Sequence, residues 1–495
     1  MLPIPQIRML AFVVPPEEHP MKELISLLLL LSICTNGYAQ ARNQHWLWHY
    51  NVHTFIGPDG PALLNDLPVT VGWDGHACIS DIEGTLLFYH DYDGLRNANG
   101  SYLLGNAVLD NIDQLRTCVG LPTPEHSNEY FVVYCTSQQS AMDPATKLLG
   151  YVQVDMAADS GNGAILSPQF EILEDSMAFI LTATPHANGS DYWALAHRLG
   201  SDEFRCHQIS NTGPTSVPVV SHAGGVFSMS AYESRDLRFS YDGDRVAMVN
   251  NGTWELYDFD DQTGTLTWLF TEPDLVLPLS AEFSFSGQYL YVIDKDSVNR
   301  IYQYDVSDPD PTAIMTSKTS VFELLYIPFE QELLTYLRLA PDRRIYFHYE
   351  DMNNGTSYLC AIDKPDSAGL ACEVQFQMLD VAPASFFGAA AVNQCKRYHD
   401  SQNTVGVQGH LASATRELVL WPSPTTNGQV WFNPPSERKG STLQIHDGHG
   451  RLIRSVPIRG RGTQSLDVDD LASGTYTATL IDGAETIGSG RLVIE

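Results

Sequence analysis

The sequence predicts an all-β protein: a β-propeller, with seven as the expected number of blades, followed by a small C-terminal β-sandwich. One strand–turn–strand pattern recurs through the middle of the chain, with its apolar marker residue at 239, 283 and 339. Short alternating runs separated by turn residues continue from about residue 42, whereas helical periodicity is almost absent. Hydrophobic residues make up 43% of the 495 residues, enough to fill the core of such a fold.

Three segments of the middle region align with one another. Each has a strand, a tight turn and a second strand, and the turns carry Asp242-Gly243, Ser286-Gly287 and Asp342-Arg343. A third alternating strand follows each pair, at residues 254–259, 300–306 and 357–362. Units of about 40–50 residues with several strands each are typical of propeller blades.

Earlier units follow the same plan more loosely. Residues 78–89 carry a turn at Glu83-Gly84, the strand at 130–134 is expected to pair with 149–155, and the strand at 192–197 with 204–209. The stretch that starts at Trp46 is the candidate for a seventh unit, and six or eight blades stay open. A tandem of β-sandwiches is the competing architecture, but it gives no reason for one motif to recur at blade spacing.

The N-terminus has the pattern of an export signal. Residues 21–39 begin with Met-Lys-Glu, continue into the apolar run Leu24–Ile33 and end on small residues. This predicts a secretory signal peptide cleaved after Ala39, with Ala41 as the second choice. Residues 1–20 contain five prolines and suit no export signal, so we expect an upstream extension from a mis-assigned start. The apolar run is too short for a bilayer span, which takes about 20 residues.

Charge separates the tail from the rest of the chain. Acidic residues outnumber basic ones by 59 to 28; residues 41–411 carry a net charge of −29 and residues 412–495 a net charge of −1. So acidic a surface argues against binding nucleic acid or anionic lipid through their phosphates. The polar stretch 400–414 is the expected linker, which places the propeller at 42–399 and the tail domain at 415–495.

The tail contains six expected strands, at residues 418–421, 429–432, 443–446, 451–457, 475–481 and 490–494. About 80 residues of this kind suit a small β-sandwich. Turn chemistry alone accounts for the glycines and prolines between these strands. Three motifs and a closing strand nevertheless follow in order: Pro422, Pro424 and Gly428; Asp447, Gly450 and Arg451; Leu471, Gly474 and Tyr476; and Arg491–Glu495. Together they resemble the type A C-terminal sorting domain of the type IX (Por) secretion system of Bacteroidota.

This resemblance implies a route out of the cell. The Sec translocon and signal peptidase would act first, and the type IX machinery would then carry the protein across the outer membrane. Its sortase would remove the tail, which leaves the protein secreted or on the outer-membrane surface after passage through the periplasm. The middle region resembles WD40/YVTN-like propellers of the same secreted proteins over most of residues 70–395. That second resemblance implies an architecture and no settled activity.

Cysteines provide the candidate disulfide. Of the eight, Cys34 belongs to the signal peptide, which leaves seven and therefore at least one free thiol in an oxidising compartment. Cys360, Cys372 and Cys395 lie closest together in the sequence, so one disulfide among them is plausible, with its pairing open. No pair has the C-x-x-C spacing of a zinc site.

Metal binding has two weak candidates. His45, His49 and His53 are four residues apart, which converges only on a helix, and their segment has the pattern of a strand. The loops Asp91–Gly94 and Asp258–Asp261 offer oxygens for Ca²⁺, but neither has the spacing of a calcium loop, and aspartates at strand ends commonly cap turns. No metal site and no cofactor are predicted, with Ca²⁺ as the one possibility.

No catalytic residue is predicted. The chain has no Gly-x-Ser-x-Gly or His-Glu-x-x-His motif, and His197 beside Cys206 suits a structural hydrogen bond better than a dyad. The leading interpretation is a non-catalytic module that binds an extracellular protein or glycan through residues that the sequence does not identify. An extracellular hydrolase or lyase with acidic residues at the channel mouth is the alternative. A self-associating surface-layer component is the third.

Overall fold

The computed structural model describes residues 45–48, 51–54, 61–64, 67, 76–91, 93–109, 113–137, 147–227, 235–250, 252–295, 298–325, 332–351, 355–383, 393–399, 416–418, 420–421, 425, 429–432, 442–446, 451–458, 464–482 and 485–494. The predicted extension, the signal peptide with Ala39 and the linker 400–414 lie outside these ranges, so all three stay predictions. Among the described residues, no helix is both long and apolar enough to span a membrane.

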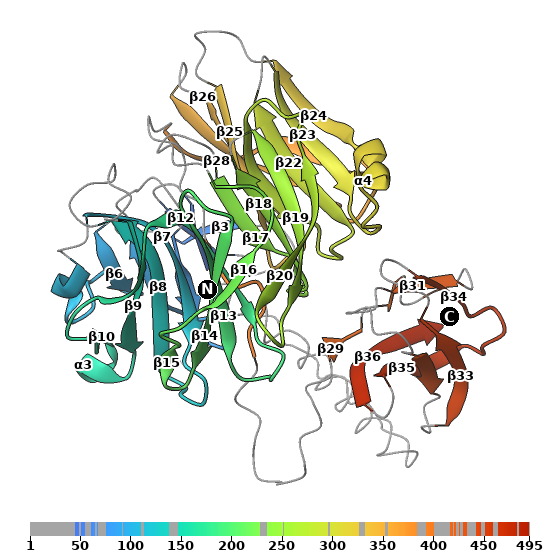
Figure 1. Ribbon diagram of the computed structural model, residues 1–495, viewed down its shortest axis with the longest axis horizontal. Coiled ribbons are helices and arrows are strands. Elements are labelled where there is room, and N and C mark those ends of the chain that lie inside the picture. Colours follow the sequence, from blue (N-terminus) through green and yellow to red (C-terminus); the bar gives the residue numbers. More distant parts are fainter. Residues whose placement is uncertain are drawn as a thin grey trace, which may run out of the picture. The chain divides into compact units, whose positions relative to one another are not determined.

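The described residues between 45 and 383 form seven antiparallel sheets in chain order (Figure 1). Two sheets have three strands: β1 (His45–Trp48), β2 (Asn51–Thr54) and β3 (Ala62–Leu64), then β4 (Cys78–Ser80), β5 (Leu86–Asp91) and β6 (Gly94–Asn97). Two have five: β7 (Asp113–Pro122), β8 (Glu129–Ser137), β9 (Lys147–Asp155), β10 (Ala164–Ile165) and β11 (Glu171–Asp175), then β12 (Met177–Pro185), β13 (Tyr192–Arg198), β14 (Glu203–Ser210), β15 (Gly213–Pro214) and β16 (Val219–His222).

The last three of these sheets have four strands each. They are β17 (Arg235–Phe239), β18 (Arg245–Asn250), β19 (Thr253–Asp260) and β20 (Thr265–Glu272); β21 (Pro278–Phe283), β22 (Tyr289–Lys295), β23 (Val298–Asp305) and β24 (Thr319–Leu325); and β25 (Glu332–Leu339), β26 (Ile345–Asp351), β27 (Thr356–Ile362) and β28 (Val374–Pro383). In the described part of the chain, four short helical segments lie between strands: η1 (Asn106–Leu109), α3 (Ala158–Gly161), α4 (Pro311–Ser317) and η3 (Gly369–Cys372).

The repeated motif forms the first two strands of each four-stranded sheet, and the predicted third strands are β19, β23 and β27. The turn between the first two strands has a left-handed residue in all three copies: Gly243 at φ +78°, Gly287 at +72° and Arg343 at +68°. Glycine reaches this region without strain, whereas Arg343 adopts it in a turn that is one residue shorter. The expected pairings of β8 with β9 and β13 with β14 are also confirmed.

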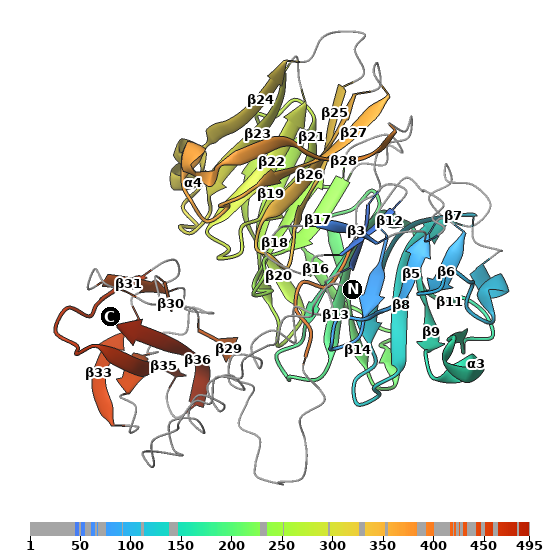
Figure 2. The same ribbon diagram turned by 180° about the vertical axis from the view of Figure 1, so that it is seen from behind.

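The seven sheets are joined in cyclic order. Apolar clusters link each sheet from the second onward to its successor, and the views from front and back agree on this order (Figures 1 and 2). The first sheet contacts the last where Trp46 packs edge-on against Tyr346, with ring centroids 6.2 Å apart. It contacts the second where Nδ1 of His45 lies 2.9 Å from Oγ of Ser80. The fold is therefore a β-propeller; the count of seven blades fits these contacts and stays a prediction.

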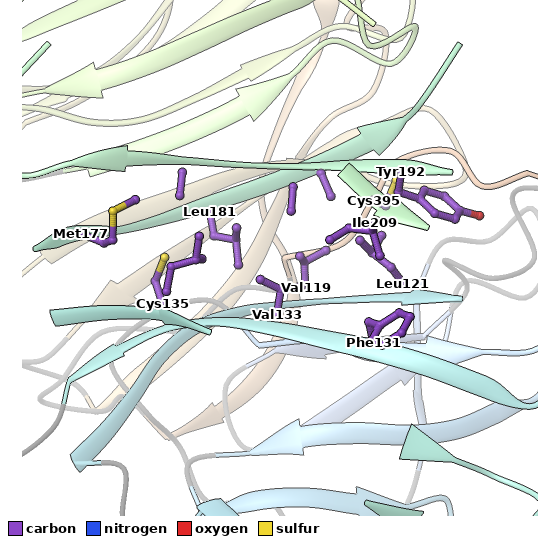
Figure 3. Close-up of a cluster of buried hydrophobic side chains, with 14 of the residues drawn as sticks. Val119, Leu121, Phe131, Val133, Cys135, Met177, Leu181, Tyr192, Ile209 and Cys395 are labelled. Atoms are coloured by element: carbon purple, nitrogen blue, oxygen red, sulfur yellow. The ribbon is translucent and has the colours of Figure 1, made fainter. Parts of the chain in front are cut away.

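Figure 3 shows how two neighbouring blades share a core. Val119, Val133 and Cys135 of the third sheet face Met177 and Leu181 of the fourth, and these five side chains are at most 3% exposed. Burying one such aliphatic side chain contributes about 1.5–3 kcal/mol. The packing between blades therefore makes a large contribution to stability.

The plausible disulfide among the three closest cysteines is not formed. Cys360 and Cys372 lie in the core between the sixth and seventh sheets, whereas Cys395 lies in the core between the third and fourth. All seven described cysteines are buried free thiols. Burial raises the pKa of Cys360 and of Cys395 to about 12, which keeps both in the unreactive thiol form.

The tail folds as two packed sheets. One contains β29 (Arg416–Glu417), β36 (Glu485–Ile494), β35 (Gly474–Asp482), β32 (Thr442–His446) and β33 (Leu452–Pro457); the other contains β30 (Leu420–Trp421), β31 (Gln429–Phe432) and β34 (Gln464–Asp467). A single apolar cluster joins the inner faces of the two sheets, as in a sandwich. The strand β34 was not predicted, because Leu466 is its only buried residue.

The last strand of the tail begins earlier than the sequence indicates. Only residues 490–494 were expected to form this strand, but β36 starts at Glu485, so Gly488 and Gly490 both lie inside it. Both glycines pair with β35, and a Cβ at Gly490 would collide with the carbonyl oxygen of Leu418. The glycine is therefore required by a close approach of two backbone segments.

Candidate functional site

The candidate site lies where the first strands of the sheets converge. Strands β7, β12, β17, β21 and β25 contact one another in sequence, which makes them the innermost strands of the propeller. The three aligned copies place Arg238, Glu282 and Arg338 at one equivalent position, directly before the apolar marker residue. Successive side chains of a strand point to opposite faces. Since the marker residue faces the blade core, the residue before it faces the axis.

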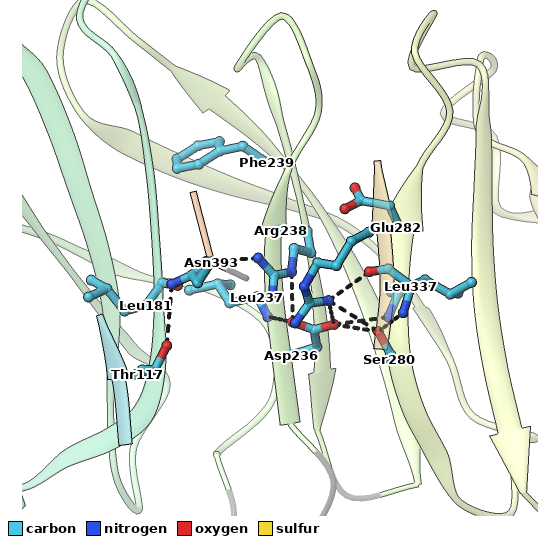
Figure 4. A network of polar contacts seen from close by, with 12 residues as sticks. Thr117, Leu181, Asp236, Leu237, Arg238, Phe239, Ser280, Glu282, Leu337 and Asn393 are labelled. Carbon is cyan, nitrogen blue, oxygen red and sulfur yellow. Dashed lines mark hydrogen bonds and ion pairs between the residues drawn. The ribbon is translucent and has the colours of Figure 1, made fainter. Parts of the chain in front are cut away.

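Asp236 is the centre of a buried ion network (Figure 4). One carboxylate oxygen accepts from Nε of Arg238 at 2.8 Å, and the other accepts from Nη1 of Arg338 at 3.0 Å. The hydroxyl of Ser280 also donates to the second oxygen, at 2.6 Å. Burial alone would raise the pKa of Asp236, but the two guanidinium groups and the Ser280 hydrogen bond outweigh it, so this pKa lies below its ordinary value.

Residues 393–399 pass along the axis and join several blades; we call them the axial segment. The amide of Asn393 donates to the carbonyls of Cys118 and Leu181 at 3.1 and 2.9 Å, and its oxygen accepts from Nη1 of Arg238 at 2.8 Å (Figure 4). Gln394 donates to the carbonyls of the first and second sheets, at His45 and Cys78. Asn393 is only 1% exposed, so these bonds replace all its contact with water.

Lys396 supplies the third cation of the axis. Its ammonium donates to the carbonyl of Phe239 at 2.6 Å and forms an ion pair with Glu282. The other carboxylate oxygen of Glu282 accepts from the backbone N–H of Leu339 at 3.1 Å. Burial lowers the pKa of Lys396, and the neighbouring charges of Arg238 and Arg338 lower it further, against the attraction of Glu282.

A strained bulge positions Arg338. Tyr336 lies at φ +48°, within the register shift of β25 between Thr335 and Arg338. A non-glycine residue costs about 1 kcal/mol or more in this conformation, and bulges redirect the side chains that follow them. The backbone N–H of Leu337, inside the bulge, donates to Oγ of Ser280 at 3.0 Å, which ties the bulge to the ion network.

A small cavity opens at this end of the axis. Its volume is about 40 Å³, and it is lined by Trp46, Arg238, Tyr241, Glu282, Arg338, Leu339, Ala340, Pro341, Gln394 and Lys396. The turns of the repeated motif lie beside it. The ring of Tyr241 lies tilted against that of Phe285, with centroids 4.3 Å apart, and the guanidinium of Arg343 lies 4.2 Å from the centre of the Phe285 ring. The axial charges and the repeat turns thus form one site.

Sequence reasoning missed these axial residues, although a signal was present. In two of the repeats an arginine, and in the third a glutamate, precedes the buried marker residue in a strand that is otherwise apolar at alternate positions. Which strand is innermost was not known, so these charges could equally have faced solvent. Asn393 and Lys396 carried no periodic signal.

Asp91 and Asp260 of the candidate calcium loops make structural contacts, and strand pairing does not place His45 and His53 opposite one another. Strand pairing places His53 opposite Trp46 rather than opposite His45, and His49 lies outside the described residues. Asp91 forms an ion pair with Arg96 at 2.6 Å, and Asp260 caps the N–H of Gln262 at 2.9 Å. No group of three or more His, Cys, Asp or Glu side chains that could hold a metal occurs among these residues.

The histidine–cysteine pair is also structural. His197 and Cys206 lie on paired strands, but Nδ1 of His197 is 2.8 Å from the carbonyl of Arg198. Burial lowers the pKa of His197 to about 4 and raises that of the Cys206 thiol well above its ordinary value. Neither protonation state is that of an activated thiolate.

Four of the nine sorting-motif residues are described. Tyr476 is 9% exposed, and its hydroxyl donates to the carbonyl of Ala472 at 2.8 Å; Leu471 packs against the tail core. Gly474 begins β35, and Arg451 directly precedes β33 with an exposed side chain. Pro422, Pro424, Gly428, Asp447 and Gly450 lie outside the described residues, so their roles stay predictions.

The solved structures that are similar to this chain match it at low sequence identity. A periplasmic gluconolactonase of Pseudomonas aeruginosa is 14% identical, with a TM-score of 0.41, and covers 70% of this chain and 98% of its own. A putative 6-phosphogluconolactonase of Bacteroides fragilis is 14% identical, with a TM-score of 0.37, over 71% of this chain and 98% of its own. A protein of unknown function from Desulfotomaculum acetoxidans is 13% identical, with a TM-score of 0.39, over 71% and 99%.

Sequence comparisons give one curated relative and one family. A funoran endo-β-hydrolase of Wenyingzhuangia aestuarii is 24% identical over 140 residues, which is 28% of this chain and only 17% of that protein. Residues 419–495 match the family described as the secretion system C-terminal sorting domain. This match confirms the resemblance of the tail, and it supports secretion or a place at the cell surface. The C-terminal part of this chain is therefore a secretion-system sorting domain.

Proposed function

We propose that this is a non-catalytic binding propeller, exported by its sorting domain, that takes an extracellular ligand at the cavity on its axis. The observation that carries the proposal is the state of the two axial carboxylates. Asp236 is held by Arg238 and Arg338, and Glu282 is held by Lys396. Each already has a cation as partner, and both are at most 4% exposed.

Hydrolysis of a glycosidic bond by two carboxyl groups requires the two groups to differ in protonation state. One must stay protonated near neutral pH to act as an acid, which needs a raised pKa. The pKa of Asp236 is instead lowered, which fixes it as an anion. The extracellular hydrolase or lyase remains the alternative function, and its catalytic carboxylate at this cavity would be Glu282.

The test separates binding from turnover. The secreted protein is incubated with a panel of neutral and acidic polysaccharides, and affinity electrophoresis measures binding while reducing-end and 235 nm absorbance assays measure cleavage. We expect retardation by at least one polysaccharide and no new chain ends. New chain ends that disappear in Glu282→Gln would establish the enzyme instead. Arg300→Gln, on β23 and paired with Glu323, is the control for a lost charge away from the axis.

A further inference from the structure

The axial cavity is positively charged in an acidic protein. Among the described side chains of the network there are three cations, Arg238, Arg338 and Lys396, against two carboxylates, Asp236 and Glu282. The chain as a whole carries a net charge of −31, so this local excess of one positive charge has the opposite sign. A buried positive excess attracts an anion much more strongly than an exposed one, because solvent screens it less.

The positive charges are built into the fold. Arg338 follows the strained bulge at Tyr336, and Arg238 is fixed by both Asp236 and Asn393. Lys396 is held between Glu282 and the carbonyl of Phe239. Burial lowers the pKa of Lys396, the attraction of Glu282 raises it, and the repulsion by the charges of Arg238 and Arg338 lowers it again. An anion in the cavity would relieve that repulsion.

Size and wall chemistry narrow the class of anion. A water molecule needs about 10–15 Å³ of such space, so the 40 Å³ cavity holds about three atoms of that size. That is enough for the two oxygens of a carboxylate or the three terminal oxygens of a sulfate ester. The rest of the lining contains the aromatic and apolar residues Trp46, Tyr241, Leu339 and Pro341. Such surfaces pack against the apolar faces of sugar rings, while the recessed shape admits one small group rather than a protein surface.

We propose that the axial cavity binds a carboxylate or sulfate group carried by an acidic extracellular polysaccharide, with Arg338 and Lys396 as the cationic contacts. This proposal rests on the proposed binding function and specifies its ligand class. A sulfate ester and a uronate carboxylate share the chemistry that the cavity recognises. An acidic peptide is the competing class and is an outcome of the test.

The test uses calorimetric titration of the secreted protein with four probes of similar length: an oligouronate, a sulfated oligogalactan, a neutral oligogalactan and hexaglutamate. We expect one of the two acidic saccharides to bind at least 10-fold more tightly than the neutral one. Its Kd should rise several-fold between 50 and 300 mM NaCl. Whichever of the two acidic saccharides has the lower Kd then identifies the ligand group as a carboxylate or a sulfate.

A matched pair of variants tests the site without cutting the ion network. Tyr241 is half-buried at the mouth, so Tyr241→Glu and Tyr241→Gln remove the same ring and differ only by a negative charge. We expect the Glu variant to bind the acidic saccharide at least 10-fold more weakly than the Gln variant, and both to bind the neutral one equally.

Each other result overturns the proposal in a distinguishable way. Equal affinity of the two variants for the acidic saccharide would place the anion site elsewhere. Neutral saccharide binding as tightly as acidic would refute the ligand class and leave the binding function intact. Binding of hexaglutamate alone would replace the polysaccharide by a peptide, and binding of none of the four, here or in the polysaccharide panel, would remove the binding function as well.

Discussion

Replacing Asn393 by alanine removes the central hydrogen-bonding group of the axial segment. Its side-chain oxygen accepts from the Arg238 guanidinium at 2.8 Å, and its amide donates to the carbonyls of Cys118 and Leu181. One charge-assisted bond contributes about 1.5–3 kcal/mol and two neutral ones about 1 kcal/mol each, so we expect a loss of about 3.5–5 kcal/mol. For a domain of roughly 350 residues this lowers Tm by about 5–7 °C.

Differential scanning calorimetry of the secreted protein measures this change directly. Asn211→Ala is the matched control, because that amide makes one exposed side-chain bond, to Glu125 at 2.7 Å. We expect the control to lower Tm by less than about 1 °C, as for other exposed polar contacts. If Asn393→Ala also changes Tm by less than about 1 °C, the axial segment does not hold the blades together and the reasoning fails.

Three further predictions follow from other parts of the fold. In urea unfolding, Gly243→Ala should destabilise the propeller by at least about 1 kcal/mol more than Gly287→Ala. Both glycines have a positive φ, but only at Gly243 would the added Cβ collide with a side chain, that of Thr184. Equal losses of unfolding free energy would contradict this. Burial lowers the pKa of His197 and of His399 to about 4 in the folded protein, against 6.5 in the unfolded chain. The stability that is present above pH 6.5 is therefore lost as the pH falls toward 4, and each histidine should cost about 2 kcal/mol of unfolding free energy at pH 5. A Tm that is unchanged between pH 7 and pH 5 would exclude this. Tyr476→Phe removes the hydrogen bond to Ala472, worth about 1 kcal/mol, so amide exchange in β35 should become about five-fold faster, whereas exchange in β18 should not change.

The sequence predicted the repeat because local chemistry determines it. The turn at Gly243 needs a left-handed residue, the flanking strands alternate, and the same signals recur at Gly287. These requirements act within about ten residues, so they can be read without knowing the fold. Arg343 kept the turn conformation with a different residue type, and it was still recognised from its neighbours.

The axial site could not be predicted in the same way. The side chain of Asn393 contacts partners that are 155 to 276 positions away, and no local pattern distinguishes it from a residue of the linker that follows. The charges of Arg238 and Arg338 become a network only because β17 and β25 are both innermost strands. For Cys395 the sequence suggested a contact that does not exist. Its closeness to Cys372 in the sequence suggested a disulfide, but the axial segment places Cys395 in a different apolar core.

The axial segment also sets an order of events in the folding of the propeller. All seven sheets precede it, yet Gln394 reaches back 349 positions to the carbonyl of His45 and Lys396 reaches back 114 to Glu282. Contacts of such long range form late in folding, because the loops they close carry a large entropic cost. Until residue 399 has arrived, the strands around the axis lack the residue that neutralises Glu282. We therefore expect the propeller to reach its final stability only when the axial segment is in place.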